Sequence, residues 1–549
     1  MPMARSLLPL LFISAAVVSF PQDKKLARLE GRVVNSVTGQ PVRKAKLRIS
    51  QRAQEPQAAG TESDAAGHFA FENLEPGTYQ LMAEKPGYLQ QVYGSRAGAF
   101  TGILITLSAR QEMKDLDFKL MPQGVITGKV LDEDGEPAGQ GVYVNVMRGT
   151  GNRRPMAMAG EMTNDLGEFR VPNLSPGRYI VVANPQNRGG LTVENGPKTE
   201  PAETPITTYY PGVTDPGAAT ILDLMPGQEL SGIVIPLRKV RAYRVQGKIA
   251  GPTASHSPNN TQIILSVRDR KDWGMSSVAG SQVKKDGSFL VENVPPGAYW
   301  ANVLVRSDHN MAAAGRAPVD VADGNVAGVV IPLTQPFAVT GKVRMEDGGQ
   351  PLSLDALRLT LRGEEGMSFG FRPASVSTDG SFKVPGVSPG KYSVYLLGLQ
   401  ETTYLKSVRL GNQETIGKGL DLTEAQGTVN LELVLGAKPG TVEGAVAEEG
   451  KAQPGVGVTL VPDPPRESLR GRVKFASADQ NGHFSMKGVA PGNYTLYALP
   501  DSSEYELLFD PDAMKAYEGK GVKVTVEEGR ATQASVTPIK PEEAPGRTP

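Results

Sequence analysis

The stretch "LSPGRYIVVA" at residues 174–183 decides the fold, because the same phrase occurs five times along the chain. Pro176 fixes φ at the first corner of a tight turn, and Gly177 can adopt the positive φ that a type II turn requires next. Tyr179 and the apolar residues after it are typical of a strand. The other copies are "LEPGTYQLMA" from Leu74, "VPPGAYWANV" from Val294, "VSPGKYSVYL" from Val387 and "VAPGNYTLYA" from Val489. Five copies of one turn predict five copies of one structural unit.

A Gly-x-Phe pair precedes every one of these turns, and its glycine stands nine residues before the turn proline each time. The five phenylalanines are 100, 120, 93 and 102 residues apart, so the period matches a whole domain rather than a solenoid unit. The motif residues are Gly67, Phe69, Pro76, Gly77 and Tyr79; Gly167, Phe169, Pro176, Gly177 and Tyr179; Gly287, Phe289, Pro296, Gly297 and Tyr299; Gly380, Phe382, Pro389, Gly390 and Tyr392; Gly482, Phe484, Pro491, Gly492 and Tyr494.

Each repeat holds about seven short segments that alternate apolar and polar residues, from an opening segment such as "VITGKV" to a closing one such as "GIVIPL". This pattern predicts an all-β fold: a tandem array of five seven-stranded Greek-key β-sandwiches, prealbumin-like or Ig-like. The predicted boundaries are 1–22 for a signal peptide, 23–121, 122–238, 239–335, 336–437 and 438–540 for the five sandwiches, and 541–549 for a disordered tail.

The repeated aromatic residues have structural roles in this interpretation. Phe69 and its equivalents point into the core, where truncation to alanine would cost about 3–5 kcal/mol. The tyrosine forms a tyrosine corner, with its ring buried and its hydroxyl bonded to nearby backbone. The Gly-x-Phe strand and the tyrosine strand are expected to form a hairpin-like pair whose register the Pro-Gly turn sets. The alternative, that the tyrosines are ligand platforms, does not explain why all five are tied to a turn.

The segment "GHFAFENLEPGTYQLMAEKPGY" (67–88) closely resembles the carboxypeptidase regulatory-like domain. The resemblance implies a prealbumin-like, seven-stranded sandwich, and the G-x-F…PGxY core extends it over roughly residues 27–540. It implies little about function, because this domain accompanies peptidases, surface proteins and outer-membrane receptors alike.

The N-terminus "MPMARSLLPLLFISAAVVSF" has a positive residue, Arg5, followed by an uncharged run over residues 6–20. This pattern predicts a cleaved secretory signal, with an uncleaved anchor as the alternative. The chain has no cysteine, which excludes disulfides, thiol chemistry and a lipoprotein anchor. Its 58 basic and 58 acidic side chains balance, so nucleic acid and anionic membranes are not expected partners. We expect a bacterial protein of the periplasm, the outer-membrane surface or the extracellular space.

The residue types that carry chemistry do not form a complete catalytic or metal-binding motif in this sequence. None of the four histidines, His68, His256, His309 and His483, stands in a zinc-peptidase motif. Ser368 in "GMSFG" matches a nucleophile-elbow pattern but lacks the helix that should follow it. The segments "DEDGE" (132–136) and "DQNG" (479–482) are spaced like part of a calcium loop, although turn chemistry explains them first. We therefore expect no enzyme, no catalytic residue, no metal and no cofactor.

Three aromatic residues outside the motif are candidates for stacking on a sugar or a peptide: Trp273, Tyr209 and Tyr210. A ligand role requires that they line one concave face. The leading hypothesis for function is a non-enzymatic cell-envelope scaffold, spacer or adhesin that binds a protein or a polysaccharide. The alternatives are a carbohydrate-binding protein and, third, an accessory subunit of an envelope peptidase or receptor.

Two further expectations concern shape. The segment "FDPDAMKAYEGKG" (509–521) predicts a short helix with Asp510 as N-cap and Pro511 in its first turn. The linkers between repeats are only about five residues long, so neighbouring sandwiches should touch end to end. This predicts a semi-rigid rod of about 150 Å, from strands of about 20 Å plus loops in each repeat.

Overall fold

The computed structural model describes residues 26–51, 58–95, 102–138, 141–148, 156–185, 203–251, 260–268, 277–307, 310–346, 353–363, 373–499, 508–509 and 514–540. In these residues the chain is all-β, as predicted, and the helical backbone is confined to short segments of at most six residues. The 3-10 turns are η1 (Pro216–Ala218), η3 (Leu354–Ala356), η4 (Glu467–Arg472) and η6 (Lys515–Tyr517). None of the helical segments described is long and apolar enough to cross a membrane.

One sheet in each repeat, here named the Phe sheet, has the opening strand at its centre. The opening strands are β1 (Ala27–Asn35), β9 (Gly124–Leu131), β19 (Tyr243–Ala250), β26 (Phe337–Met345) and β35 (Gly440–Glu448). They pair antiparallel with the Gly-x-Phe strands β4 (His68–Leu74), β12 (Glu168–Leu174), β22 (Ser288–Val294), β29 (Ser381–Val387) and β39 (His483–Val489). They pair parallel with the closing strands β8 (Glu112–Leu120), β17 (Glu229–Pro236), β25 (Val326–Pro332), β34 (Thr428–Gly436) and β42 (Ala531–Val536).

The second sheet of each repeat, the Tyr sheet, contains the strand that follows the Pro-Gly turn. These Tyr strands are β5 (Gly77–Glu84), β13 (Gly177–Pro185), β23 (Gly297–Ser307), β30 (Lys391–Leu397) and β40 (Gly492–Leu499). Each pairs antiparallel with β2 (Lys46–Gln51), β10 (Val142–Arg148), β20 (Thr261–Val267), β27 (Arg358–Gly363) or β37 (Gly457–Pro462). Outside those strands lie β3 (Ala58–Glu62), β11 (Met156–Met162), β21 (Ser277–Gln282), β28 (Ala374–Ser375) and β38 (Lys474–Ser477). The other side of the Tyr strands is taken by β6 (Gln91–Val92), β7 (Ile105–Leu107), β15 (Thr208–Tyr209), β16 (Leu222–Leu224), β24 (Asn310–Val321), β33 (Leu420–Asp421) and β41 (Val522–Val526).

The two sheets of a repeat enclose one apolar core, because alternate residues of their strands point inward. Each of the five main clusters of buried side chains draws on a single repeat and contains its motif phenylalanine and tyrosine. The described residues thus contain sheet pairs of this kind in succession along the chain. The count of five domains and their boundaries stay a prediction.

Segments added to this common plan cover outer faces and edges. The long connection after β13 adds β14 (Glu203–Ile206), which pairs with β18 (Arg238–Arg241). In the fourth repeat, β31 (Tyr404–Leu410) extends the Phe sheet beyond β34 and turns into β32 (Gln413–Glu414). In the fifth, β36 (Lys451–Ala452) pairs with β35. In the same repeat Leu508 and Tyr517 pack with Val461, Tyr497 and Leu499 into a separate outer cluster.

Of the segment 509–521 the structure describes 509 and 514–521, and helical backbone is present there, ending in the 3-10 turn η6. Met514 before it has α-helical backbone, with φ −58° and ψ −30°. Asp510 and Pro511, the expected cap and first-turn residues, lie outside the described residues. Tyr517 is fully buried in the outer cluster of the fifth repeat, so η6 closes one face of the Tyr sheet.

The Pro-Gly motif does not form the expected type II turn. Gly177, Gly390 and Gly492 have positive φ of 156°, 156° and 151°, and Gly77 and Gly297 have no positive φ. A type II turn needs about +80° at this position. In four of the repeats this glycine is already the first residue of the Tyr strand. The positive φ expected from the turn chemistry is thus present at three of the five glycines, whereas the type II conformation itself is not.

The left-handed residue of this motif stands three positions before the proline in every repeat. These residues are Asn73, Asn173, Asn293, Gly386 and Gly488, with φ between 57° and 72°. Each lies at the end of a Gly-x-Phe strand, where the pairing with the opening strand shifts register. The motif therefore contains a β-bulge, which bends the chain out of the Phe sheet.

The expected hairpin between the Gly-x-Phe strand and the Tyr strand is also absent. β4 pairs with β1, whereas β5 pairs with β2, so the Pro-Gly segment carries the chain from one sheet to the other. The remaining four repeats have the same arrangement. The short spacing between the two strands reflects a crossing between layers, and the bulge before the proline makes that crossing possible.

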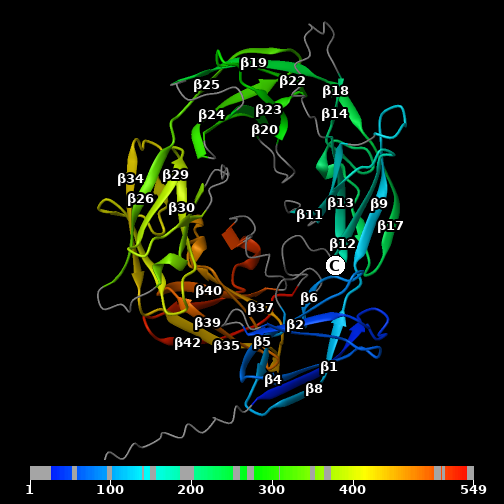
Figure 1. The fold of residues 1–549 in the computed structure, drawn as a ribbon, viewed down its shortest axis with the longest axis vertical. Helices are drawn as coiled ribbons and strands as arrows, with labels where there is room; N and C mark the ends of the chain where they lie inside the picture. The colour runs from blue at the N-terminus through cyan, green and yellow to red at the C-terminus, as the bar shows by residue number, and fades with distance from the viewer. Residues whose placement is uncertain are drawn as a thin grey trace, which may run out of the picture.

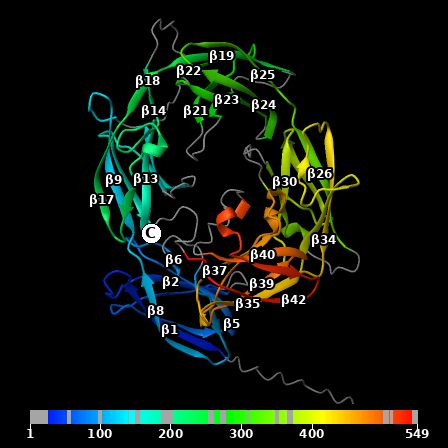
Figure 2. The ribbon, with the colours of Figure 1, turned by 180° about the vertical axis from the view of Figure 1, so that it is seen from behind.

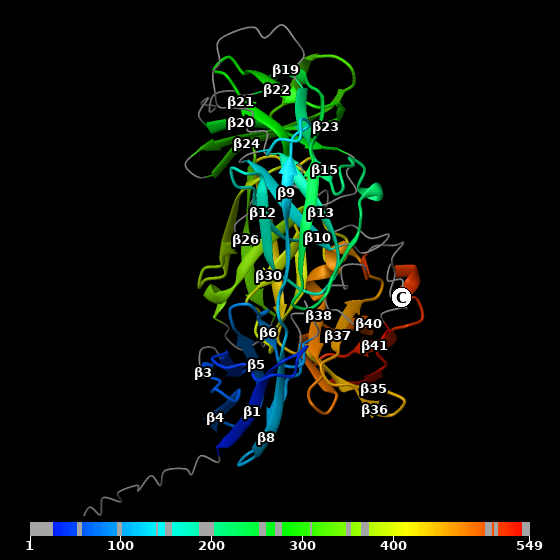
Figure 3. The same cartoon turned by 90° about the vertical axis from the view of Figure 1, so that its right-hand side faces the viewer.

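The five repeats follow one another around a ring (Figure 1). The first repeat, with β1 and β8, and the fifth, with β35 and β42, lie side by side at the same end of the molecule. The view from behind shows the same neighbours (Figure 2). The edge-on view also places β1 next to β35 (Figure 3). The predicted end-to-end rod is therefore wrong. The linkers are short as expected, but the successive joints bend the chain in one direction until it meets its own beginning.

Contacts between the first and fifth repeats close this ring. The side-chain amide of Gln480 donates to the Thr106 carbonyl at 3.1 Å and accepts from the Thr106 backbone N–H at 3.0 Å. Leu104 and Asp479 form a parallel β-bridge beside it. Gly455 lies so close to Ile103 that an added Cβ would stand 2.8 Å from its Cγ1. The closing contact therefore combines backbone pairing, a two-bond amide contact and close packing.

Candidate functional site

The five motif tyrosines have one geometry. The hydroxyl of each donates to the carbonyl of the residue before the turn proline: Tyr79 to Glu75 at 2.6 Å, Tyr179 to Ser175 at 2.5 Å, Tyr299 to Pro295 at 2.8 Å, Tyr392 to Ser388 at 2.6 Å and Tyr494 to Ala490 at 2.7 Å. Their side chains are at most 5 % exposed. Burial raises the pKa of Tyr392 and of Tyr494 to about 12. Each tyrosine thus ties the crossing segment to the core, and its ring has no free face for a ligand.

The motif phenylalanines require a second residue that was overlooked in the sequence, a glycine in the middle of each opening strand. Gly31, Gly128, Gly247, Gly341 and Gly444 stand directly opposite the phenylalanines. A Cβ on these glycines would lie 1.6–2.2 Å from a carbonyl oxygen of the closing strand. In the first four repeats it would also lie 2.6–2.8 Å from the phenylalanine ring. The signal was present, since each opening segment has this glycine, as in "EGRV" and "TGKV".

The three aromatic residues proposed for ligand stacking do not come together in the described residues. Tyr209 is 3 % exposed and packs with Met147, Ile180 and Val182 on the outer face of the Tyr sheet. Tyr210, the next residue, packs against the main core of the same repeat. Trp273 lies outside the described residues. Tyr209 therefore covers the sheet as a structural residue, and the two tyrosines do not share a surface.

The two described histidines lie on the surface. His68 lies 3.5 Å from the Asp64 carboxylate on the surface, with 63 % of its side chain exposed. His483 is exposed at the equivalent position of the fifth repeat. His256, His309 and Ser368 lie outside the described residues. Among the residues that the structure describes, no group of three or more His, Cys, Asp or Glu could hold a metal ion.

The two calcium-like segments form turns whose leading carboxylates are bonded to backbone. Asp132 accepts from the N–H groups of Asp134 and Glu136, both at 3.0 Å. Asp479 accepts from those of Asn481 and His483, both at 2.8 Å. These bonds are the turn chemistry that aspartate favours.

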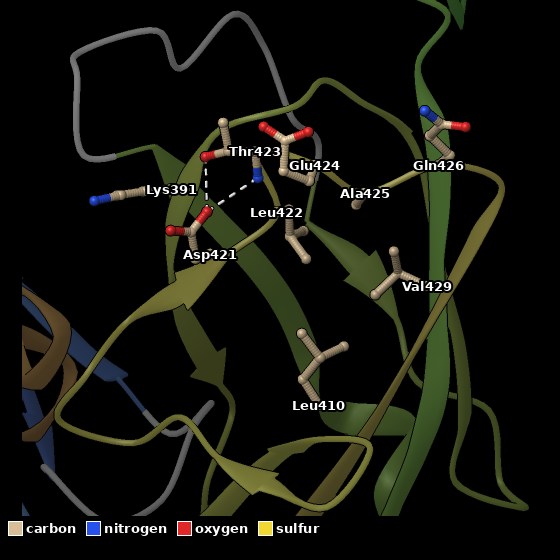
Figure 4. Close-up of a pocket in the computed structure, with 9 residues that line it drawn as sticks. All are labelled: Lys391, Leu410, Asp421, Leu422, Thr423, Glu424, Ala425, Gln426 and Val429. Carbon is tan, nitrogen blue, oxygen red and sulfur yellow. Dashed lines mark hydrogen bonds between the residues drawn. The ribbon is translucent and has the colours of Figure 1, made fainter.

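An open pocket of about 640 Å³ lies at one end of the fourth repeat (Figure 4). Leu410, Leu422 and Val429 supply its apolar side, and Asp421, Thr423 and Glu424 supply polar groups at its rim. Asp421 accepts from the Thr423 hydroxyl at 2.7 Å and from its N–H at 3.0 Å, and these bonds lower the pKa of the carboxyl. Lys391 extends away from these side chains (Figure 4). The Asp421 carboxylate thus stabilises the turn to which it belongs. The pocket combines an apolar side with a polar rim.

The joint between the fourth and fifth repeats brings charged side chains together. From η4 and its flanks, the Arg466 guanidinium donates to the Gly417 carbonyl at 3.2 Å and that of Arg472 to the Leu405 carbonyl at 3.4 Å. Lys487 lies 3.7 Å from Glu401. Lys474 is desolvated here, and this burial lowers its pKa. The bonds span the joint and restrict its bending.

Comparison with known proteins supports the resemblance inferred from the sequence. Residues 28–120 match the carboxypeptidase regulatory-like domain family. This match covers the first repeat and confirms the resemblance there. No match to a curated protein was found.

Several solved structures are similar to parts of the chain. The TIE protein of Bacillus anthracis matches at 10 % identity and a TM-score of 0.17, over 56 % of this chain and 51 % of that one. The chain thus spans about half the length of the TIE protein. The minor pilin GBS52 of Streptococcus agalactiae matches at 12 % identity and 0.21, over 39 % and 96 %. The major pilin subunit BcpA of Bacillus cereus matches at 10 % identity and 0.14, over 56 % and 99 %. With TM-scores of this size, the fold class rests on the strand pairing described above.

Proposed function

We propose that the protein is an exported, non-enzymatic scaffold of the bacterial cell envelope, built from five carboxypeptidase regulatory-like sandwiches. The observation that carries this proposal is the closed ring. Gln480 and Asp479 of the fifth repeat bond to Leu104 and Thr106 of the first, so five rigid sandwiches are held in one arrangement. A ring of this kind presents its loops at fixed relative positions, which is what a scaffold for a protein or polysaccharide partner requires.

The ring changes the original hypothesis. A spacer or an extended adhesin depended on the rod, and the rod is absent. A carbohydrate-binding role depended on Trp273, Tyr209 and Tyr210 sharing one face. Because Tyr209 is buried, it cannot contribute to such a face, and the carbohydrate-binding role loses its main support. Of the proposed roles, the scaffold is therefore the one that the closed ring supports.

Export is tested by fractionating cells that produce the chain with a C-terminal tag. We expect a processed band in the periplasmic or extracellular fraction, while a matched form that begins at residue 23 stays in the cytoplasm. Full-length chain in the cytoplasm would contradict the export part of the proposal.

Scaffolding is tested by titrating the purified mature chain against isolated envelope proteins and, separately, against peptidoglycan and soluble glycans. We expect saturable binding to envelope material without turnover of peptide or glycoside substrates. Saturable binding to one soluble glycan alone would replace the scaffold by the carbohydrate-binding alternative. Sustained turnover of a substrate would overturn the non-enzymatic assignment.

A further inference from the structure

The closing strands of the repeats differ in how their free edges are protected. In the first three repeats one residue of the closing strand has left-handed backbone: Asp115 with φ 59°, Gly232 with φ 78° and Gly328 with φ 76°. The pairing with the opening strand shifts register at these residues. In the fourth repeat β34 pairs regularly with β26, and β31 covers its other side. Bulges and covering strands both prevent an edge from pairing with another chain.

β42 of the fifth repeat has neither protection. Its pairing with β35 runs without a shift from Thr441–Ala531 to Val446–Val536. On its other side, no strand among the described residues pairs with it. Its sequence, ATQASV, contains no charged residue, proline or glycine. Lys, Pro and bulges are the usual means of blocking an edge, so β42 is a regular edge that remains open to pairing.

The backbone groups on the open side of β42 belong to Ala531, Gln533 and Ser535. The Thr441 N–H donates to the Arg530 carbonyl at 2.9 Å, which sets the bonding pattern toward β35. Because backbone groups alternate between the two sides of a strand, every second residue from Ala531 points its N–H and C=O away from β35. These three residues are also exposed.

We infer that β42 is a docking strand for a second copy of this chain, and that two β42 strands pair antiparallel around a two-fold axis at Gln533. This register places Ala531 opposite Ser535 of the other copy and Gln533 opposite Gln533. Each such pair exchanges two N–H···O=C bonds, about six in all. The two Phe sheets then join into one continuous sheet.

Two observations favour a second copy as the occupant. The outward residues are symmetric in size around Gln533, with small alanine and serine on either side, and none is charged, so self-pairing brings no like charges together. A two-fold axis makes such a contact self-complementary. The fourth repeat also shows that the equivalent edge of this fold accepts an antiparallel strand, since β31 pairs with β34 from Tyr404 to Leu410.

The test is the oligomeric state of the mature full chain, measured by light scattering and sedimentation from about 1 to 100 μM. We expect a dimer that dissociates on dilution. Gln533→Pro removes an outward N–H but none of the backbone bonds to β35, and it also removes the exposed side-chain bond to Glu443 at 3.3 Å. It should therefore give a monomer that unfolds within about 1 kcal/mol of wild type. Gln533→Lys places two ammonium groups opposite each other and should also give a monomer, with dimer partly restored at high salt.

The matched control is Val330→Lys, which adds the same charge to the bulged closing strand β25, where Val330 is 58 % exposed. It should leave the dimer unchanged. A wild-type chain that is monomeric throughout this range overturns the inference. A dimer that survives both Gln533 variants overturns it as well, because it must then form elsewhere. The oligomeric state is read independently of export and envelope binding, so this inference can fail without the proposed function failing.

Discussion

The glycine opposite each motif phenylalanine makes a specific prediction at the residue scale. A Cβ on Gly341 would stand 1.9 Å from the Leu431 carbonyl oxygen and 2.6 Å from the Phe382 ring. Neither neighbour can move freely, since one is backbone of the closing strand and the other fills the core. We expect Gly341→Ala to destabilise the fourth repeat by about 3 kcal/mol or more, the upper range for overpacking, measured by denaturant unfolding.

Gly324→Ala is the control for that measurement. No atom lies within 4 Å of the position of its Cβ, and its backbone is not left-handed. This variant should unfold within about 0.5 kcal/mol of wild type, the range of ordinary surface changes. Equal effects at the two positions would show that steric contact with the closing strand is not the reason for the glycine.

The buried tyrosines predict a loss of stability in alkali. The pKa of Tyr392 and of Tyr494 is raised to about 12 because burial disfavours the charged phenolate. In the unfolded chain the pKa is about 10. The stabilisation is therefore fully present below pH 10 and is lost as the pH rises from 10 to 12, by up to about 3 kcal/mol for each tyrosine.

Unfolding of wild type and of Tyr494→Phe at pH 8, 10 and 11 measures this effect. The variant should lose about 1 kcal/mol at pH 8, since its hydroxyl bond to the Ala490 carbonyl is missing. Between pH 10 and 11 its stability should fall less steeply than that of wild type. Parallel pH profiles would contradict the assignment of the alkaline loss to Tyr494.

At the scale of the secondary-structure element, the bulge before the Pro-Gly crossing predicts which residues its left-handed position accepts. Asn173 has φ 59° and its side chain is exposed. Asn173→Ala should cost about 1 kcal/mol, because alanine is strained in the left-handed region. Asn173→Gly should be neutral within a few tenths, since Gly386 and Gly488 already occupy this position in other repeats. The two variants are compared by thermal and denaturant unfolding, and an alanine variant as stable as the glycine variant would contradict this explanation.

The same element shows how far the sequence can be interpreted. Alternation and the fixed nine-residue spacing predict the strands and the tyrosine corner, because both are local properties. The strand pairing was predicted wrongly, because Leu74 and Gly77 are so close in sequence that a hairpin was assumed. Only the bulge at Asn73, which needs one left-handed residue, shows that the chain leaves the sheet there. The pairing of Gly31 with Phe69 depends on register between distant segments, which the sequence does not display directly.

The arrangement of the whole molecule depends on contacts that occur once rather than five times. Gln480 is not one of the repeated motif residues, and its contact occurs once. Its side-chain amide nevertheless joins the fifth repeat to the first. Arg472 belongs to η4 and Arg466 directly precedes it, and the other repeats lack this turn in the described residues. Short linkers indicated contact between neighbours but not the direction of each bend. The ring therefore could not be inferred from the repeat pattern, whereas the sandwich could.

The closing contact at Gln480 makes the last prediction, on the shape of the mature chain. Gln480→Glu keeps the side-chain size but replaces the amide donor by a carboxylate, which then faces the Thr106 carbonyl oxygen. Adding Ile103→Glu places a second carboxylate where Ile103 packs against Gly455. Two half-buried, unpaired charges facing this contact should weaken it enough to separate the repeats. Small-angle scattering of the double variant should then give a larger maximum dimension than wild type, toward the roughly 150 Å of an extended array of sandwiches.

Asn481→Asp makes the same charge change on the next, exposed residue and should leave the scattering curve unchanged. A wild-type curve that already has the rod dimension, or a double variant as compact as wild type, would show that this contact does not hold the ring closed.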